Sequence, residues 1–288
     1  MRSLLFVPAD GGSKLDKAMA SGADGVIIDL EDSIAAESKE SARKLALDFL
    51  KSAQSRKDRP QLLVRINGLD TGMTDADLDA VVPGKPDAVL LPKAEGGATV
   101  IHLDAKLTVR EALAGLPEGE IKILAQTVES PAGLFSAGSY RNCSARLIGM
   151  TWGPEDLSAE LGAEANREID GTLTEPYRIA RAMCLFGAAA AKVSAIETIY
   201  VNFRDTDVLR KDTELARRDG FTGRLAIHPA QVPVINEVFT PSTAQIEKAK
   251  AIVAAFEAKP GAGTVGMDGK MYDRPHLARA QALLQRVK

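Results

Sequence analysis

The chain has 288 residues, with 36 lysines and arginines, 39 aspartates and glutamates, and a hydrophobic share of 45%. This length suits one large α/β barrel or two smaller domains, and the composition is ordinary for a globular protein. The balanced charge, the lack of a long Lys/Arg run and the 5% aromatic content argue against a nucleic-acid-binding protein.

The N-terminal sequence "MRSLLFVPADGG" contains an apolar run that is too short for a signal peptide. No uninterrupted apolar stretch approaches the roughly 18 residues that a membrane helix needs. Cys143 and Cys184 lie in no CxxC or other metal-binding spacing, which favours free thiols in a reducing compartment. We therefore expect a cytoplasmic protein that has no membrane partner.

Short apolar runs alternate with longer segments of helical periodicity along most of the chain. The runs occupy residues 3–9, 25–32, 61–67, 88–94, 121–129, 146–153, 195–201 and 224–230. They are almost continuously apolar, as expected of parallel strands that are buried on both faces. This alternation predicts a TIM (β/α)8 barrel, an α/β fold, and a doubly wound open sheet is the alternative.

The pattern changes after Lys259, so we assign residues 1–259 to the barrel domain. The stretch "PGAGTVGMDGK" is rich in glycine and has no periodicity, which predicts a linker. Its "GAGTVG" spells GxGxxG, but no strand precedes it and too little chain remains for a dinucleotide-binding βαβ unit. A last helix is expected in "RPHLARAQALLQRV". Residues 260–288 thus form an extra C-terminal helical segment, which packs either on its own barrel or on a neighbouring subunit.

Ionisable residues gather where the predicted strands end. They are Asp29, Glu31, Asp32, Arg65, Lys93, Glu129 and Asp156. The carboxyl ends of barrel strands share one face, and catalytic residues collect there. A single charge at such an end is often an ordinary salt bridge, and Lys14 and Lys93 could equally meet the phosphates of an anionic ligand. A cluster is harder to explain in this way, because each buried charge is costly unless it is paired or bound to a metal.

Glu129 and Asp156 would suit a hard divalent ion such as Mg²⁺, which binds a few carboxylates and keeps part of its water. The three histidines form no HxH or HExxH pattern, which disfavours zinc. A 2-oxo acid could chelate such an ion, which would then act as a Lewis acid on the keto oxygen. Arg65 offers donors to a carboxylate or a developing enolate. These parts suit the making and breaking of carbon–carbon bonds next to carbonyl groups.

Several motifs follow one another along the chain: "SLLFVPA", "GVIIDLEDSI", "LLVRIN", "VLLPKAE", "QTVESPAGL", "IGMTWGPEDL", "AIHPAQ" and "GKMYDRPHL". In sequence and in order they closely resemble the HpcH/HpaI aldolase–citrate lyase β-subunit superfamily, in its CitE-like and malyl-CoA lyase branch. The resemblance covers almost the whole chain. It implies a Mg²⁺-dependent carbon–carbon lyase that acts on β-hydroxyacyl-CoA thioesters and releases or uses a small 2-oxo acid.

The resemblance also implies roles for individual residues. Glu129 and Asp156 would bind the metal, and Glu31 and Asp32 would support its water shell. Arg65 would bind the oxo acid and stabilise the thioester enolate.

Further residues complete the site that the resemblance implies. Phe6, Pro8, Gly153 and Pro154 are expected to contact the substrate. Asp273, in "GKMYDRP", would enter the site of a neighbouring subunit as an acid/base, so we expect a homo-oligomer, a trimer or a hexamer.

The sequence leaves alternatives to the lyase open. One is a malyl-CoA thioesterase, in which water finishes the reaction, and another is a metal-dependent aldolase that does not use CoA. A third is the β component of a citrate lyase assembly, which would dock on an acyl-carrier protein. The acyl group and the preferred direction are not determined by the sequence.

Overall fold

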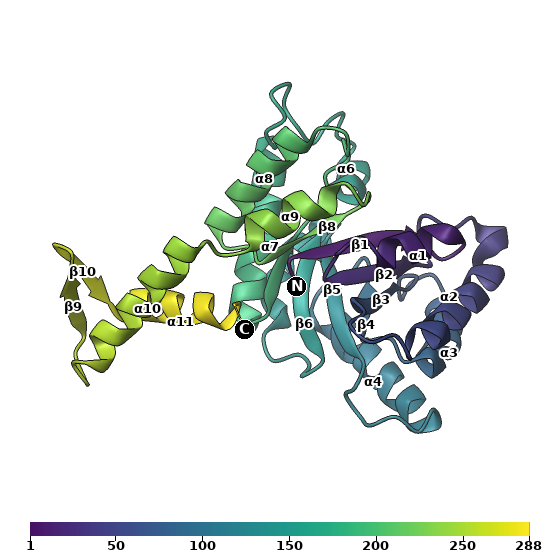
Figure 1. Cartoon of the computed structure of the whole chain (residues 1–288). Helices are drawn as coiled ribbons and strands as arrows, with labels where there is room; N and C mark the ends of the chain where they lie inside the picture. Colours follow the sequence, from purple (N-terminus) through teal and green to yellow (C-terminus); the bar gives the residue numbers. More distant parts are fainter. Residues whose placement is uncertain (288) are drawn as a thin grey trace. The chain divides into compact units, whose positions relative to one another are not determined.

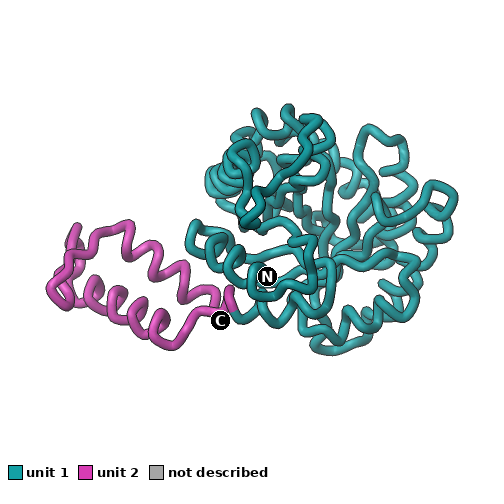
Figure 2. Tube along the Cα trace, turned by 90° about the horizontal axis from the view of Figure 1, so that it is seen from above, with its two compact units in different colours: residues 1–237 teal, residues 238–288 magenta. Residues whose placement is uncertain are grey.

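The computed structural model of the protein describes residues 1–287 and divides the chain into two compact units. Unit 1 comprises residues 1–237 and unit 2 residues 238–288 (Figure 2). The division lies earlier in the chain than the boundary that the sequence suggested, between residues 259 and 260. Among the described residues, no helix is long and apolar enough to cross a membrane.

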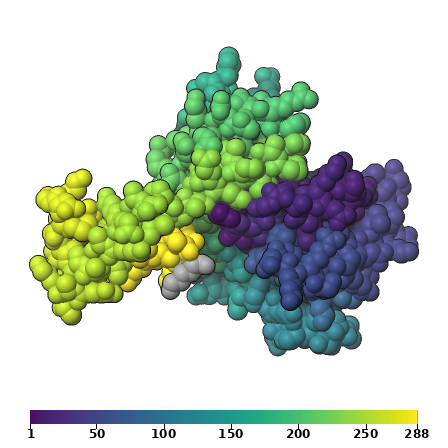
Figure 3. Space-filling model, viewed as in Figure 1, coloured from purple at the N-terminus to yellow at the C-terminus, as the bar shows by residue number. Residues whose placement is uncertain are grey.

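Unit 1 is a closed barrel of eight parallel strands in which each strand pairs with the next and β8 pairs with β1. Figure 1 shows this barrel with helices around it, and Figure 3 shows the same view as a space-filling surface, with the purple N-terminal residues beside green residues from later in the chain. The strands are β1 (Ser3–Pro8), β2 (Gly25–Asp29), β3 (Gln61–Arg65), β4 (Ala88–Leu91), β5 (Lys122–Val128), β6 (Leu147–Trp152), β7 (Ser194–Glu197) and β8 (Gly223–Ala226). The predicted TIM barrel is confirmed, with each strand at its predicted place and all eight strands shorter than predicted.

The interior of the barrel is filled by apolar side chains from nearly every strand. This buried cluster comprises Leu4, Ile27, Leu63, Ala88, Leu90, Leu124, Ile196 and Leu225. The alternate residues of the same strands, such as Val26 and Ile28, are also fully buried. Because successive side chains of a strand point to opposite faces, burial of both sets explains the continuous apolar runs in the sequence.

The helices of the barrel follow the strands in alternation. They are α1 (Ser13–Met19), α2 (Lys39–Ala53), α3 (Thr74–Val81), α4 (Gly97–Leu113), α5 (Pro131–Phe135), α6 (Pro154–Leu161), α7 (Glu175–Ala191), α8 (Thr206–Asp219) and α9 (Gln231–Phe239). Short 3₁₀ turns occupy Ala36–Ser38, Val82–Gly84 and Ala137–Tyr140. In α2 the buried residues are Ala42, Ala46, Leu50 and Ala53, a spacing of one helical face.

A buried ion-pair network ties α4 to the start of β6, away from the strand ends that carry the cluster. Arg146 is 3% exposed and pairs with Glu111, which is fully buried, at 2.7 Å. It also pairs with Asp104 at 2.5 Å. Glu111 accepts further hydrogen bonds from the backbone nitrogens of Gly119 and Ile121. Each buried charge therefore has partners, as a buried charge requires.

Unit 2 contains α10 (Thr243–Glu257), β9 (Thr264–Met267), β10 (Lys270–Asp273) and α11 (Arg274–Gln285). The prediction of a linker was wrong, because residues 264–273 form an antiparallel hairpin. Its turn is Asp268–Gly269, where both residues have positive φ angles of 51° and 71°. Such an Asp-Gly turn is a strong hairpin signal. Val265 and Tyr272 anchor the hairpin in a core with Ile252, Phe256 and Ala280 of the two helices.

Candidate active site

The barrel brings the predicted acidic residues to one end, where its strands finish. Asp29 is the last residue of β2, and Glu31 and Asp32 follow it in the next loop. Arg65 ends β3 and Glu129 lies one residue beyond β5. This is the face on which TIM barrels place their catalytic residues.

Glu129 is 2% exposed, so its strand delivers a carboxyl group into the interior. Its Oε2 accepts a hydrogen bond from the backbone nitrogen of Lys93 at 2.6 Å, and its Oε1 accepts one from Nε2 of Gln126. Burial raises the pKa of Glu129 well above its usual range, and the nearby charge of Asp156 adds to this effect. The same burial and nearby negative charge would favour a cation beside this carboxyl group, because a cation stabilises its ionised form.

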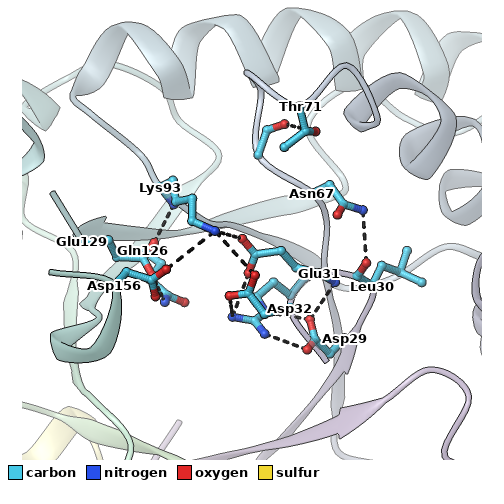
Figure 4. A network of polar contacts seen from close by, with 12 residues as sticks. Asp29, Leu30, Glu31, Asp32, Asn67, Thr71, Lys93, Gln126, Glu129 and Asp156 are labelled. Carbon is cyan, nitrogen blue, oxygen red and sulfur yellow. Dashed lines mark hydrogen bonds and ion pairs between the residues drawn. The ribbon is translucent and has the colours of Figure 1, made fainter. Parts of the chain in front are cut away.

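Asp156 lies in the first turn of α6, directly after β6. Because β5 and β6 are paired neighbours, the loop after each strand brings its carboxylate to the same place. Figure 4 shows Glu129, Gln126 and Asp156 gathered together. The side chain of Asp156 is 30% exposed, so the pair has one buried and one accessible member.

Arg65 is held by two acidic residues, one at the end of β2 and one in the loop after it. Its Nε and Nη2 each donate to one oxygen of Asp29 at 2.6 Å, and its Nη1 lies 2.9 Å from Oε2 of Glu31. Burial alone would raise the pKa of Asp29, but the Arg65 guanidinium outweighs it and lowers that pKa below its usual value. The guanidinium also lies over the ring of Phe6, 4.9 Å from the ring centroid. Arg65 is thus fixed in position while part of it still faces the cavity.

Lys93 links the acidic groups of the site. Its Nζ lies 2.7 Å from Glu31, 3.6 Å from Asp32 and 3.7 Å from Asp156 (Figure 4). The sequence placed this residue in the cluster at the strand ends and predicted either a ligand phosphate or a salt bridge as its partner. The signal for a role in the site was its place directly after the fourth strand, in "LLPKAE".

A cavity of 370 Å³ opens beside these groups. The predicted residues that line it are Phe6, Pro8, Asp32, Arg65, Gly153, Pro154 and Asp156. Glu129 and Glu31 are buried and are absent from the lining, although Gln126, which bonds Glu129, is part of it. Sequence reasoning missed Gln126 and the apolar wall formed by Ile199, Leu225 and Ile227. Asp273 lies in unit 2, at the start of α11, where it caps the helix by accepting from the backbone nitrogen of His276.

The two carboxylates of Glu129 and Asp156 fit magnesium better than a metal that needs three or more protein ligands. Within residues 1–287, no group of three His, Cys, Asp or Glu side chains is arranged to hold a metal ion. Mg²⁺ commonly takes only one or two carboxylates, with water and substrate as its other ligands. Glu129 and Asp156 match this requirement. The buried Oε1 of Gln126, which has no hydrogen-bond partner among the described residues, leaves an acceptor for such a water or for substrate.

A sequence model of the HpcH/HpaI aldolase/citrate lyase family matches residues 2–229. The chain belongs to this family. The citrate lyase β subunit of Haemophilus influenzae is 35% identical over 289 residues, which cover 100% of this chain and 97% of that protein. A (3S)-malyl-CoA thioesterase of Cereibacter sphaeroides is 34% identical over 294 residues, which cover 100% of this chain and 94% of that protein.

Solved structures that resemble this chain share its fold. CitE of Mycobacterium tuberculosis, in complex with magnesium, acetoacetate and coenzyme A, has a TM-score of 0.77 and 31% identity, with 99% of both chains covered. RipC of Yersinia pestis has a TM-score of 0.68 and 32% identity, covering 85% of this chain and 98% of its own. The predicted family is confirmed, and the predicted Mg²⁺ is present in the CitE complexes with acetoacetate and with pyruvate.

Proposed function

We propose that the protein is a Mg²⁺-dependent carbon–carbon lyase. It would cleave a β-hydroxyacyl-CoA thioester, such as malyl-, methylmalyl- or citramalyl-CoA, into an acyl-CoA and a 2-oxo acid, or run the reverse condensation. The observation that supports this most is the pairing of Glu129 with Asp156 beside Arg65 at one cavity. Binding of magnesium, acetoacetate and coenzyme A by the related CitE is further support.

Glu129 and Asp156 would hold the metal, while Glu31 and Asp32 would accept hydrogen bonds from its water shell. When bound, Mg²⁺ supplies a Lewis acid that polarises the oxygen of the oxo-acid half of the substrate. Arg65 would bind the substrate carboxylate or the enolate, because Asp29 and Glu31 already fix its guanidinium.

In the cleavage direction, the substrate hydroxyl gives its proton to a base and becomes the keto group as the carbon–carbon bond breaks. The electron pair of that bond moves into the thioester, which departs as an enolate. Arg65 stabilises the negative charge of the enolate. Asp273 of a neighbouring subunit then protonates the enolate carbon, which yields the acyl-CoA. In the reverse direction, Asp273 removes a proton from the acyl-CoA.

The oligomer and the compartment belong to the same proposal. Unit 2 carries Asp273 and has a core of its own, as a segment that completes another subunit's site would need. We therefore propose a homotrimer or a hexamer.

The two cysteines are free in the structure, which agrees with the proposed cytoplasmic location.

Two alternative functions have support from relatives of similar identity. The thioesterase of Cereibacter sphaeroides favours release of free CoA by water. The citrate lyase β subunits favour a role on a thioester that an acyl-carrier protein presents. A third, an aldolase that does not use CoA, is opposed by the coenzyme A in the CitE complex.

One experiment separates these functions. Purified protein and Mg²⁺ are incubated with a panel of hydroxyacyl-CoAs, and the product masses are measured, with Glu129→Gln as the inactive control. Acyl-CoA plus an oxo acid supports the lyase, and free CoA plus the hydroxy acid supports the thioesterase. If no CoA ester reacts, the panel is replaced by thioesters on an acyl-carrier protein and by free hydroxy-oxo acids. Turnover of only one of these would replace the proposal by the β-subunit function or by the CoA-independent aldolase.

A further inference from the structure

Lys93 occupies a strained position that serves two parts of the site at once. Its φ angle of 50° lies in the left-handed region, which side-chain-bearing residues rarely adopt. In this conformation its backbone nitrogen donates a hydrogen bond to Glu129, and its side chain extends to the carboxylate of Glu31 in the loop after β2. Strain of this kind persists where the surrounding contacts over-determine it, often at a functional site.

The ammonium group of Lys93 supplies positive charge where carboxylates converge. Two elements present three carboxylates to it: the loop after β2 presents Glu31 and Asp32, and α6 presents Asp156. Arg65, the other cation of this cluster, is already bonded to both oxygens of Asp29. Among the ion pairs of the described residues, Lys93 is the partner of Asp156.

The contact with Asp156 is the loosest of these interactions. At 3.7 Å it is longer than a hydrogen bond, whereas the contact with Glu31 is 2.7 Å. The Lys93 side chain is 40% exposed, and a lysine ammonium sits on a flexible four-carbon stem. It can therefore withdraw from Asp156 without leaving Glu31.

We propose that the ammonium group of Lys93 supplies, in the metal-free protein, the positive charge that the divalent cation supplies when it is bound. It neutralises Asp156 and Glu31 while the metal is absent, and it gives up Asp156 when the metal binds to Glu129 and Asp156. Its charge consequently opposes the metal, and the site holds Mg²⁺ less tightly than its carboxylates alone would. This inference rests on the proposed metal site.

The test is calorimetric titration of the substrate-free protein with Mg²⁺, and with Mn²⁺ as a second probe, at one near-neutral pH and low ionic strength. Lys93→Met keeps the backbone nitrogen and most of the side-chain length but removes the charge. We expect its metal affinity to rise about fivefold or more, because a nearby like charge has been removed. Lys93→Arg keeps the charge, and its affinity should stay close to that of the unaltered protein.

Lys122→Met is the matched control for the change in net charge. Lys122 begins β5, at the other end of the strand that leads to Glu129, and its Nζ donates to the carbonyl of Gly119. Its metal affinity should be unchanged. Equal or weaker metal binding by folded Lys93→Met, judged by its circular dichroism spectrum, would overturn the inference while leaving the proposed function intact. Failure of the unaltered protein to bind either metal would overturn both.

Discussion

Arg65 and Asp29, the last residues of two paired strands, face each other in register and share two contacts of 2.6 Å. Two parallel N–H to oxygen contacts fix the plane of a guanidinium as well as its position. Arg65 is therefore oriented before any substrate arrives. Preorganised donors of this kind stabilise developing charge without reorganisation during the reaction.

The Asp29→Asn substitution tests this orientation. The amide keeps the shape of the side chain but removes its charge and one of its acceptors, so the guanidinium should lose its fixed direction. We expect turnover to fall about 100-fold, because small misplacements of a catalytic group are that costly. Steady-state kinetics check this, with Asp24→Asn as control. Asp24 lies just before β2, pairs with Arg2, and should matter only for stability. Equal kinetic losses in both variants would contradict the assignment.

Glu129→Gln should abolish metal binding, since a neutral amide cannot replace a buried anionic ligand of Mg²⁺. In the unaltered protein, Mg²⁺ should raise the melting temperature in proportion to the logarithm of its concentration above the dissociation constant. Scanning fluorimetry at increasing Mg²⁺ concentrations would record this rise and its loss in the variant. A magnesium-dependent rise that survives the substitution would remove Glu129 from the metal site.

The raised pKa of Glu129 gives the sign of a pH effect on the metal-free protein. A carboxyl group whose pKa is raised by folding favours the folded state at low pH, and this contribution is lost as the pH rises through the raised value. With a chelator present, stability should therefore fall as the pH increases beyond the usual carboxylate range. Mg²⁺ should restore it most at the higher pH. Melting temperatures across a pH series, with and without chelator, would measure both effects, and Glu129→Gln should flatten the first.

Asp273 can be tested without disturbing the helix that it caps. Asparagine is as good an N-cap as aspartate, whereas alanine costs roughly 1 kcal/mol at that position. Asp273→Asn should thus keep the fold of unit 2 yet reduce thioester turnover by about 10²–10⁴, the usual worth of a general acid–base group. Binding of Mg²⁺ and of an oxo acid, followed by calorimetry, should be intact. Unchanged turnover would exclude Asp273 from the chemistry.

Arg146→Met tests the buried network away from the site. It leaves Glu111 buried without its cation, which we expect to destabilise the fold by about 3–5 kcal/mol. Burial alone would raise the pKa of Glu111, but Arg146 lowers it below the usual value. The stabilising contribution is therefore present above the ordinary carboxylate pKa and is lost as the pH falls through the lowered one. Urea unfolding from neutral to acid pH should show a smaller decline in the variant.

Most of the barrel could be predicted because each strand is a short run that is almost continuously apolar. A strand with one face in solvent would instead alternate apolar and polar residues. Burial on both faces leaves the continuous apolar pattern in the sequence, so all eight strands were found. The hairpin of unit 2 was not predicted, because its glycine content is typical of a linker. Its two strands are short, and Val265 and Tyr272 are their buried residues. The Asp268–Gly269 turn was the available signal.

The sequence by itself determined the barrel, the family and the set of charged residues at the strand ends. These features can be predicted from local patterns, because the burial of a strand determines which residue types occur at its consecutive positions. Only the tertiary structure decided which charges meet: Arg65 with Asp29, and Lys93 with Glu31 and Asp156. Those pairings depend on the barrel's register and on one left-handed residue, which place side chains that are 36 and 62 residues apart within hydrogen-bond distance.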